Sequence, residues 1–157
     1  MRIGSSRSTP IRLKLDLFSK VMTPKLPQIR HVRGLRVLLV EDNLVNQIIV
    51  RELLEGQGAS VQIAENGQLA VDILTTQADH FDVVLMDLQM PVMDGLQASR
   101  HIRSELKLTK LPIIAMTANV LPNSKQDCMD AGMNDFISKP FVSKDLLAKL
   151  LLHTSLD

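Results

Sequence analysis

The chain has 157 residues, of which 45% are hydrophobic and 22% are charged, a composition typical of one globular domain with a sizeable core. No apolar run approaches the roughly 18 residues that span a membrane, and the N-terminus lacks the apolar stretch of a secretory signal. The single cysteine excludes an internal disulfide and favours a reducing compartment, and the absence of Trp and Tyr leaves little for stacking on nucleobases.

The net charge of +1 is unevenly distributed along the chain. Residues 1–34 carry eight Lys/Arg and one acid, whereas residues 35–157 have a net charge of −6. We therefore treat 1–34 as a basic N-terminal extension or linker and 35–157 as the domain. Residues 11–18 alternate like a half-buried strand. They are interpreted as the tail of an upstream kinase domain, a membrane-surface arm, a transit peptide or simply added residues, and a fragment or linker is favoured.

From residue 35 short apolar runs alternate with amphipathic stretches. The predicted strands are 35–40, 61–64, 81–86, 111–116 and 136–138, and the predicted helices are 44–57, 67–78, 95–106, 122–131 and 143–153. Several of the runs are continuous rather than alternating, which is typical of strands buried on both faces. Five strands alternating with five helices predict a parallel, doubly wound α/β sheet.

Reactive side chains follow the predicted strands at the point where each one ends. In such folds ligands bind at the carboxyl ends of the strands. Three carboxylates, a hydroxyl and an ammonium occupy these positions: Glu41 and Asp42 after the first strand, Asp87 after the third, Thr117 after the fourth and Lys139 after the fifth. If the first and third strands are neighbours, the three carboxylates converge.

Three unpaired carboxylates at such short distances would repel one another, and a bound divalent cation would offset this repulsion. Mg²⁺ prefers hard oxygen ligands and commonly shares a phosphate. A carboxylate can also attack phosphorus to give an aspartyl phosphate. Each residue alone has an ordinary explanation as a helix cap, a turn residue or a solvated charge. Their occurrence together, at four strand ends, indicates a phosphoryl-transfer site.

The segment from about 35 to 155 resembles the receiver domain of two-component response regulators. The resemblance is carried by Val-Glu-Asp-Asn at 40–43, Leu-Met-Asp-Leu-Gln-Met-Pro-Val-Met-Asp-Gly at 85–95, Ile-Ala-Met-Thr-Ala at 114–118 and Lys-Pro at 139–140. The Glu-Asp-Asn-x-x-Asn pattern at 41–46 is most similar to receivers of hybrid sensor histidine kinases. The resemblance implies a flavodoxin-like fold with strand order 2-1-3-4-5.

The resemblance also implies the roles of the site residues. Asp87 is the expected phosphoacceptor, with Mg²⁺ held by Glu41, Asp42, Asp87 and the main-chain carbonyl of Gln89. Thr117 and Lys139 are expected to contact the phosphoryl oxygens, and Thr117 and Phe136 to form the switch. Phe136 has no hydroxyl, so its switching would rest on packing alone. A cis Lys139–Pro140 bond is expected to aim the lysine at Asp87.

The expected function is that of a phosphoacceptor in a phosphorelay, receiving a phosphoryl group from a histidine kinase or a histidine-phosphotransfer domain. Such a domain is not a conventional enzyme, since it catalyses only its own phosphorylation and dephosphorylation, although its parent protein would be a histidine kinase. A stand-alone response regulator is the alternative. We expect a cytoplasmic domain, free or as part of a membrane-bound sensor kinase. No nucleic acid partner is expected, because the acidic domain lacks a basic stripe.

Three rival functions fit the sequence less well. A phosphatase of the haloacid-dehalogenase kind needs a second Asp two residues after the nucleophile, where this chain has Gln89. A structural module that is never phosphorylated would not need the complete reactive set. A nucleotide-binding protein would need a Gly-rich loop after the first strand, so no small-molecule cofactor beyond the metal is expected.

A helical wheel of 44–57 predicts the partner surface. It places Asn46, Ile49, Val50, Leu53 and Leu54 on the side that faces the sheet, and Leu44 and Ile48 on the opposite side. Two exposed aliphatic residues beside the acids predict a docking site for a histidine-phosphotransfer domain.

Overall fold

A computed structural model describes residues 32–118 and 122–154, and every structural statement below concerns these residues. The interpretations of the N-terminal segment fall on residues 1–31 and lie outside the described part. The described unit begins at Val32, whose side chain is fully buried in the same core as Leu35. Val32 therefore packs with the domain.

Five strands form one parallel sheet in the order β2-β1-β3-β4-β5, as predicted. In chain order the elements are β1 (Arg36–Val40), α2 (Leu44–Gly56), β2 (Ser60–Ala64), α3 (Gly67–Gln77), the 3₁₀ turn η2 (Ala78–His80), β3 (Val83–Asp87), α4 (Gly95–Ser104), β4 (Ile113–Thr117), α5 (Pro122–Asp130), β5 (Asp135–Ser138) and α6 (Ser143–His153). Four of the five helices end one or two residues earlier than predicted, and α6 matches its prediction. None of the helices in these ranges is both long enough and apolar enough to cross a membrane.

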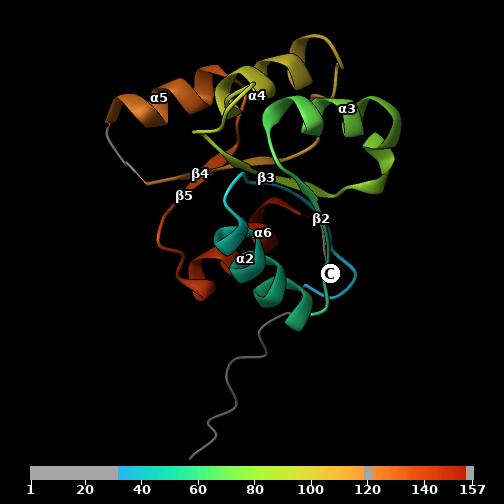
Figure 1. Ribbon diagram of the computed structural model, residues 1–157, viewed down its shortest axis with the longest axis vertical. Coiled ribbons are helices and arrows are strands. Elements are labelled where there is room, and N and C mark those ends of the chain that lie inside the picture. The colour runs from blue at the N-terminus through green and yellow to red at the C-terminus, as the bar shows by residue number, and fades with distance from the viewer. Residues whose placement is uncertain (1–31, 119–121, 155–157) are drawn as a thin grey trace, which may run out of the picture. The chain divides into compact units, whose positions relative to one another are not determined.

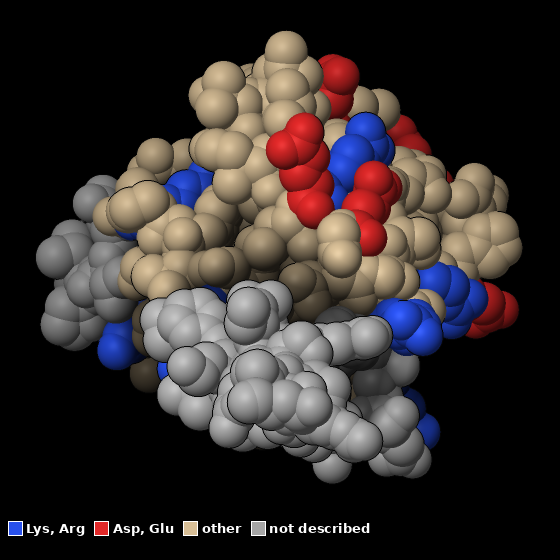
Figure 2. Space-filling view, turned by 90° about the horizontal axis from the view of Figure 1, so that it is seen from below, with Lys and Arg blue, Asp and Glu red and all other residues tan. Residues whose placement is uncertain are grey.

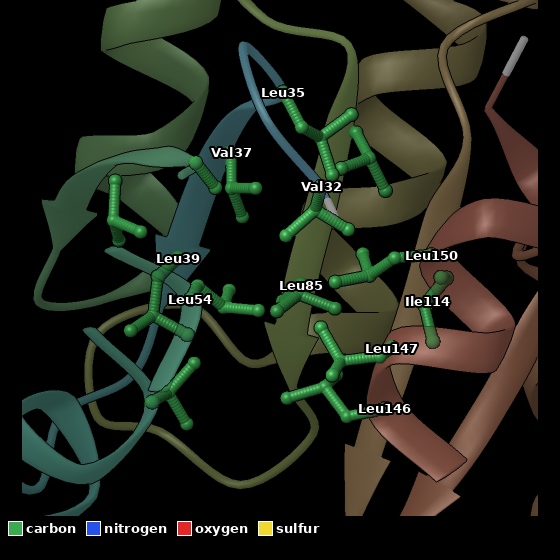
Figure 3. Close-up of a cluster of buried hydrophobic side chains, with 14 of the residues drawn as sticks. Val32, Leu35, Val37, Leu39, Leu54, Leu85, Ile114, Leu146, Leu147 and Leu150 are labelled. Atoms are coloured by element: carbon green, nitrogen blue, oxygen red, sulfur yellow. The ribbon is translucent and has the colours of Figure 1, made fainter. Parts of the chain in front are cut away.

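The sheet is covered by helices on both faces, with α2 and α6 on one side and α3, α4 and α5 on the other (Figure 1). Successive strand residues point to opposite faces, so each strand contributes to both cores. Figure 3 shows Leu39, Leu85 and Ile114 from the strands meeting Leu54 of α2 and Leu146 of α6. The second core takes the alternate strand residues, among them Leu38, Val84 and Ala115.

Local sequence explains where the helices begin and end. The side chains of Asn43, Asn66 and Asp94 each accept a hydrogen bond from the backbone N–H three residues later, and Asp94 forms a reciprocal capping box with Gln97. Gly58 and Gly132, which lie two residues after the ends of α2 and α5, have φ of 95° and 88°, which favours glycine. These caps fix the short connections that carry the site residues.

Candidate functional site

The parallel register brings the predicted site residues to one edge of the sheet. Val40 of β1 pairs with Met86 of β3, so Glu41 and Asp42 follow β1 beside the end of β3. The third strand extends one residue further than predicted and ends with Asp87 itself, which pairs with Met116 of β4. Thr117 is the last residue of β4 and pairs with Ser138 of β5, so Lys139 comes next at the same edge.

Three carboxylates converge at this edge. One oxygen each from Glu41, Asp42 and Asp87 lie within 4.8 Å of one another, as the sequence predicted from neighbouring strands. Glu41 and Asp87 are buried, with 1% and 5% of their surface exposed, whereas Asp42 is exposed. The group is therefore embedded in the sheet edge on one side and open to solvent on the other.

Lys139 reaches back from the end of β5 to two of these acids. Its Nζ lies 2.9 Å from Glu41 Oε2 and 3.3 Å from Asp87 Oδ2. The Lys139–Pro140 bond is cis, as predicted, and the Lys139 backbone N–H donates to the Thr117 carbonyl at 2.8 Å. With three carboxylates and one ammonium, the cluster has a formal charge of −2 when all four groups are ionised.

Glu41 is held in place by the first turn of α2. The Asn43 N–H and the Asn46 side-chain amide both donate to its Oε1, at 3.1 and 3.4 Å. The buried Gln47 side chain donates to the Glu41 carbonyl oxygen at 2.7 Å. The sequence reading missed Gln47. The signal in the sequence is a glutamine on the apolar face of a helix, because a buried side-chain amide needs a hydrogen-bond partner.

The surroundings shift the pKa of both Asp87 and Lys139. Burial and then the charge of Glu41 raise the pKa of Asp87 to about 6, against the opposing effects of Lys139 and of the Gln89 N–H. Burial tends to lower the pKa of Lys139, but its hydrogen bond to Glu41 and the charges of Asp87 and Glu41 outweigh that effect and raise it. One ammonium group therefore does not fully offset the repulsion between the carboxylates.

The remaining predicted site residues lie around this cluster. The Gln89 N–H donates to Asp87 Oδ1 at 3.3 Å. Phe136, in β5, is half-buried, and the Nζ atoms of Lys125 and Lys149 both lie 4.7 Å from the centre of its ring. The aromatic ring thus contacts one ammonium from α5 and one from α6.

The outer face of α2 differs in part from the wheel prediction. Leu44 and Ile48 are exposed as predicted, by 67% and 48%, but Ile49 was wrongly assigned to the sheet side and is 49% exposed. The buried face is instead formed by Gln47, Val50 and Leu54. The bond from Gln47 to the Glu41 carbonyl turns that residue inward, and Ile49 joins Val45 on the outside.

Comparison with known proteins now identifies the family. The response regulator receiver domain family matches residues 37–151. The chain belongs to this family. The chain shares the fold and strand order of receiver domains with known structures.

Curated relatives include both hybrid kinases and a separate regulator. The chain is 42% identical over 127 residues to the sensor protein GacS of Pseudomonas syringae, covering 79% of the chain but only 14% of that protein. It is 44% identical to the two-component response regulator ORR41 of rice, covering 74% of the chain and 91% of the regulator. The chain therefore spans a small part of the first relative and nearly all of the second.

Two solved structures bear on the site. The receiver domain of the sensor histidine kinase PA1611 of Pseudomonas aeruginosa is 41% identical with a TM-score of 0.68, covers 74% of this chain and 94% of its own, and has a magnesium ion in its active site cleft. A complex of the yeast histidine phosphotransfer protein Ypd1 with the receiver domain of Ssk1 also matches. Its identity is 32% and its TM-score 0.69, over 75% of this chain and 87% of that one.

Proposed function

We propose that this chain accepts a phosphoryl group on Asp87 from a phosphohistidine, in the presence of Mg²⁺. The observation that carries the proposal is the convergence of three carboxylate oxygens within 4.8 Å, with Lys139 against two of the acids, at the carboxyl edge of a parallel sheet. Asp87 is the acid that ends the fully buried strand β3.

The donor set fits Mg²⁺. Glu41, Asp42, Asp87 and the main-chain carbonyl of Gln89 would hold the ion, and all of these are the hard oxygens that it prefers. The cluster's formal charge of −2 equals what one divalent cation neutralises. When bound, the ion would offset the negative charge of the phosphoryl oxygens. The magnesium ion in the PA1611 receiver domain supports this assignment.

The chain's own residues supply the rest of the reaction. An Asp87 carboxylate oxygen forms the new O–P bond while the P–N bond of the phosphohistidine breaks, and the electron pair of that bond stays with the imidazole. A donor imidazole protonated on its other nitrogen leaves in its neutral form. Lys139 shifts from the carboxylates to a phosphoryl oxygen, and the Thr117 hydroxyl donates to another. Burial of Asp87 keeps competing water from one side of the acyl phosphate.

Thr117 and Phe136 form the proposed switch. Thr117 ends β4 and Phe136 lies in the neighbouring β5, where it pairs with Ala115. Movement of the Thr117 hydroxyl toward a phosphoryl group would change the space into which the Phe136 ring packs. Since the ring has no hydroxyl, its position depends on packing and on the ammonium groups of Lys125 and Lys149.

Phosphorylation by a small donor tests the acceptor assignment. The wild-type chain is incubated with Mg²⁺ and acetyl phosphate, and its intact mass is measured. We expect one added phosphoryl group on the wild type, none on Asp87→Asn, and none on the wild type when Mg²⁺ is chelated. Asp94→Asn serves as the matched control, because Asp94 is bound in the capping box of α4. Equal labelling of Asp87→Asn would contradict the proposal.

The partner is proposed to dock on the outer face of α2. Leu44, Val45, Ile48 and Ile49 are all exposed, by 48 to 67%, and together they form an aliphatic patch over the first two turns of the helix. The patch begins two residues after Asp42, so a protein seated there is close enough to present a phosphohistidine to Asp87. Figure 2 shows acidic and basic side chains interleaved beside broad uncharged stretches on the described part of the face that it views.

A histidine-phosphotransfer domain is the occupant that fits best. Its helices can present an apolar surface together with the histidine, and a phosphotransfer protein is bound to the receiver domain in the Ypd1–Ssk1 complex. Changing Leu44 and Ile48 to Ser should slow transfer from phosphorylated Ypd1 about tenfold or more while leaving acetyl phosphate labelling unchanged. Leu152→Ser, an equally simple change at a 73% exposed leucine on α6, is the control. If both donors slow together, or neither does, the docking assignment is wrong.

We place the domain in a hybrid sensor histidine kinase, as a cytoplasmic part of that protein. The similarity to GacS and to the Dictyostelium discoideum hybrid histidine kinase M, which is 44% identical over 123 residues, supports this context. The match to nearly the whole of ORR41 favours the alternative, a stand-alone regulator. Immunodetection in the source cells distinguishes the two. We expect the antibody to detect a protein much larger than one of 157 residues, whereas a protein of about that size would support the alternative.

A further inference from the structure

The loop at 88–94, which joins Asp87 to α4, is strained. Within it the Met93 N–H donates to the Pro91 carbonyl at 2.8 Å, closing a three-residue turn around Val92, whose φ is 70°. A β-branched residue rarely adopts this conformation. The Val92 side chain is 81% exposed, so its own contacts do little to offset the strain. The conformation must be held by the backbone contacts of the loop.

Two backbone hydrogen bonds attach the loop to its neighbours. At its inner end the Gly95 N–H donates to the Leu88 carbonyl at 3.1 Å. At its outer end the Met93 carbonyl accepts a hydrogen bond of 3.1 Å from the N–H of Gly67, the first residue of α3. The first N–H groups of a helix have no acceptor within the helix, so the loop carbonyl gives this donor a partner. The outer fastening therefore joins two elements that are distant in the sequence.

Gly67 leaves no room for a side chain at this junction. A Cβ atom at residue 67 would lie 2.5 Å from the Met93 carbonyl oxygen, 3.0 Å from Ala98 Cβ and 3.1 Å from the Asp94 carbonyl oxygen. The closest of these atoms belongs to the backbone and cannot rotate away. Gly67 does not have the positive φ that would itself demand glycine, so what the residue supplies is space.

We propose that Gly67 is a positioning residue for the phosphoacceptor site. By allowing α3 to approach the Met93 carbonyl, it holds the strained loop so that Gln89 stays against Asp87, where the Gln89 N–H donates to Oδ1. Any added side chain pushes Met93 outward and loosens the segment that carries Gln89. The relevance of this role to a phosphoacceptor site rests on the proposed function, whereas the attachment of the loop to α3 does not.

Gly67→Ala tests the proposal in the full chain, with Gly56→Ala as the matched control. A Cβ added at Gly56, the last residue of α2, meets no atom within 4 Å. Two quantities are measured, namely hydrogen exchange of amides 88–95 without metal and the Mg²⁺ dissociation constant by calorimetric titration, and urea denaturation checks that each variant is folded. For Gly67→Ala we expect loop amides to exchange about tenfold faster and Mg²⁺ to bind about tenfold more weakly, the range for loss of a group that supports metal ligands. Gly56→Ala should match the wild type in both.

The outcomes separate this proposal from the proposed function. If the wild type binds Mg²⁺ and Gly67→Ala binds it within twofold with unchanged loop exchange, the positioning role is refuted. If the wild type itself binds no Mg²⁺, the proposed function fails, and loop exchange alone decides the role of Gly67. Should Gly67→Ala not fold, the wild type still provides a test. Its Gly67 amide should exchange at least about tenfold more slowly than an unbonded amide, and exchange at the unbonded rate would overturn the proposal.

Discussion

Lys139 Nζ lies 2.9 Å from Glu41 Oε2, although the two residues are 98 positions apart in the chain. They follow β5 and β1, which are not neighbours in the sheet, and the lysine side chain spans the ends of β4 and β3 between them. The glutamate is 1% exposed at its side chain and the lysine 18%. This pair therefore links the ends of the edge strand β5 and the interior strand β1 through the site itself.

Replacing Lys139 should lower the stability of the metal-free protein and make the stability of the variant depend more strongly on Mg²⁺. Lys139→Met leaves buried Glu41 without its cation, which costs about 2 kcal/mol of unfolding free energy in the presence of a chelator. Mg²⁺ should recover more stability in this variant than in the wild type, because it restores positive charge. Urea denaturation with and without Mg²⁺ provides the measurement. Lys144→Met, at an exposed residue of α6, is the control, and an equal Mg²⁺ effect in all three proteins would contradict the prediction.

Neutralising Asp87 should stabilise the metal-free fold. The raised pKa of Asp87 means that its charged form is disfavoured by burial and by Glu41. Asp87→Asn keeps the shape of the side chain and removes that charge, so the unfolding free energy at pH 8 with a chelator should rise by roughly 1–2 kcal/mol. With saturating Mg²⁺ the order should reverse, since the variant loses a ligand. A less stable Asp87→Asn in the chelated state would show that Lys139 already compensates the charge.

The Arg36–Asp82 pair predicts a loss of stability in acid. The guanidinium donates to both Asp82 oxygens, at 2.9 and 3.2 Å, and this hydrogen bonding lowers the pKa of the carboxyl below its ordinary value of 3.8. Because the folded pKa is the lower one, the stabilisation is present above about pH 4 and is lost as the pH falls through the folded pKa. Asp82→Asn should cost about 0.5–1 kcal/mol at pH 7, a modest value because Arg36 is half exposed.

The measurement is the difference in unfolding free energy between wild type and Asp82→Asn from pH 7 to pH 2.5. It should shrink toward zero at the acid end and be smaller at high salt. Glu52→Gln, at an exposed acid of α2, should show little difference at pH 7. A difference that stays constant with pH would mean that the pair contributes through packing rather than charge.

Even a conservative substitution of Arg103 is predicted to destabilise the fold. Its guanidinium donates to the carbonyl oxygens of Gly132 and Leu111, at 2.8 and 2.7 Å, and to Asn134 Oδ1 at 2.9 Å. Burial lowers the pKa of this arginine, and the planar fork is what reaches several acceptors at once. Arg103→Lys should lower the unfolding free energy by about 2 kcal/mol, measured by urea denaturation. Arg100→Lys, exposed on the same helix, should change it little, and equal effects would refute the geometric argument.

The order of strands and helices and the position of the acids at one edge of the sheet could be predicted from the sequence, because both depend on local patterns. Continuous apolar runs indicate buried strands, and the acids that follow them must lie at the carboxyl edge of a parallel sheet. Asn43, Asn66 and Asp94 could likewise be expected near helix starts, since their side chains accept bonds from nearby backbone.

Other features depended on contacts between distant elements. Ile49 lies outside rather than against the sheet because the bond from Gln47 to the Glu41 carbonyl sets the rotation of α2, which a helical wheel does not contain. The role of Gly67 arises only where α3 meets the Met93 carbonyl, 26 positions later in the chain. Sequence patterns thus determined which residues reach the sheet edge, because strand and helix periods are local. Tertiary packing decided how each is oriented there, because the partners of a buried polar group and the room beside a glycine come from other elements of the fold.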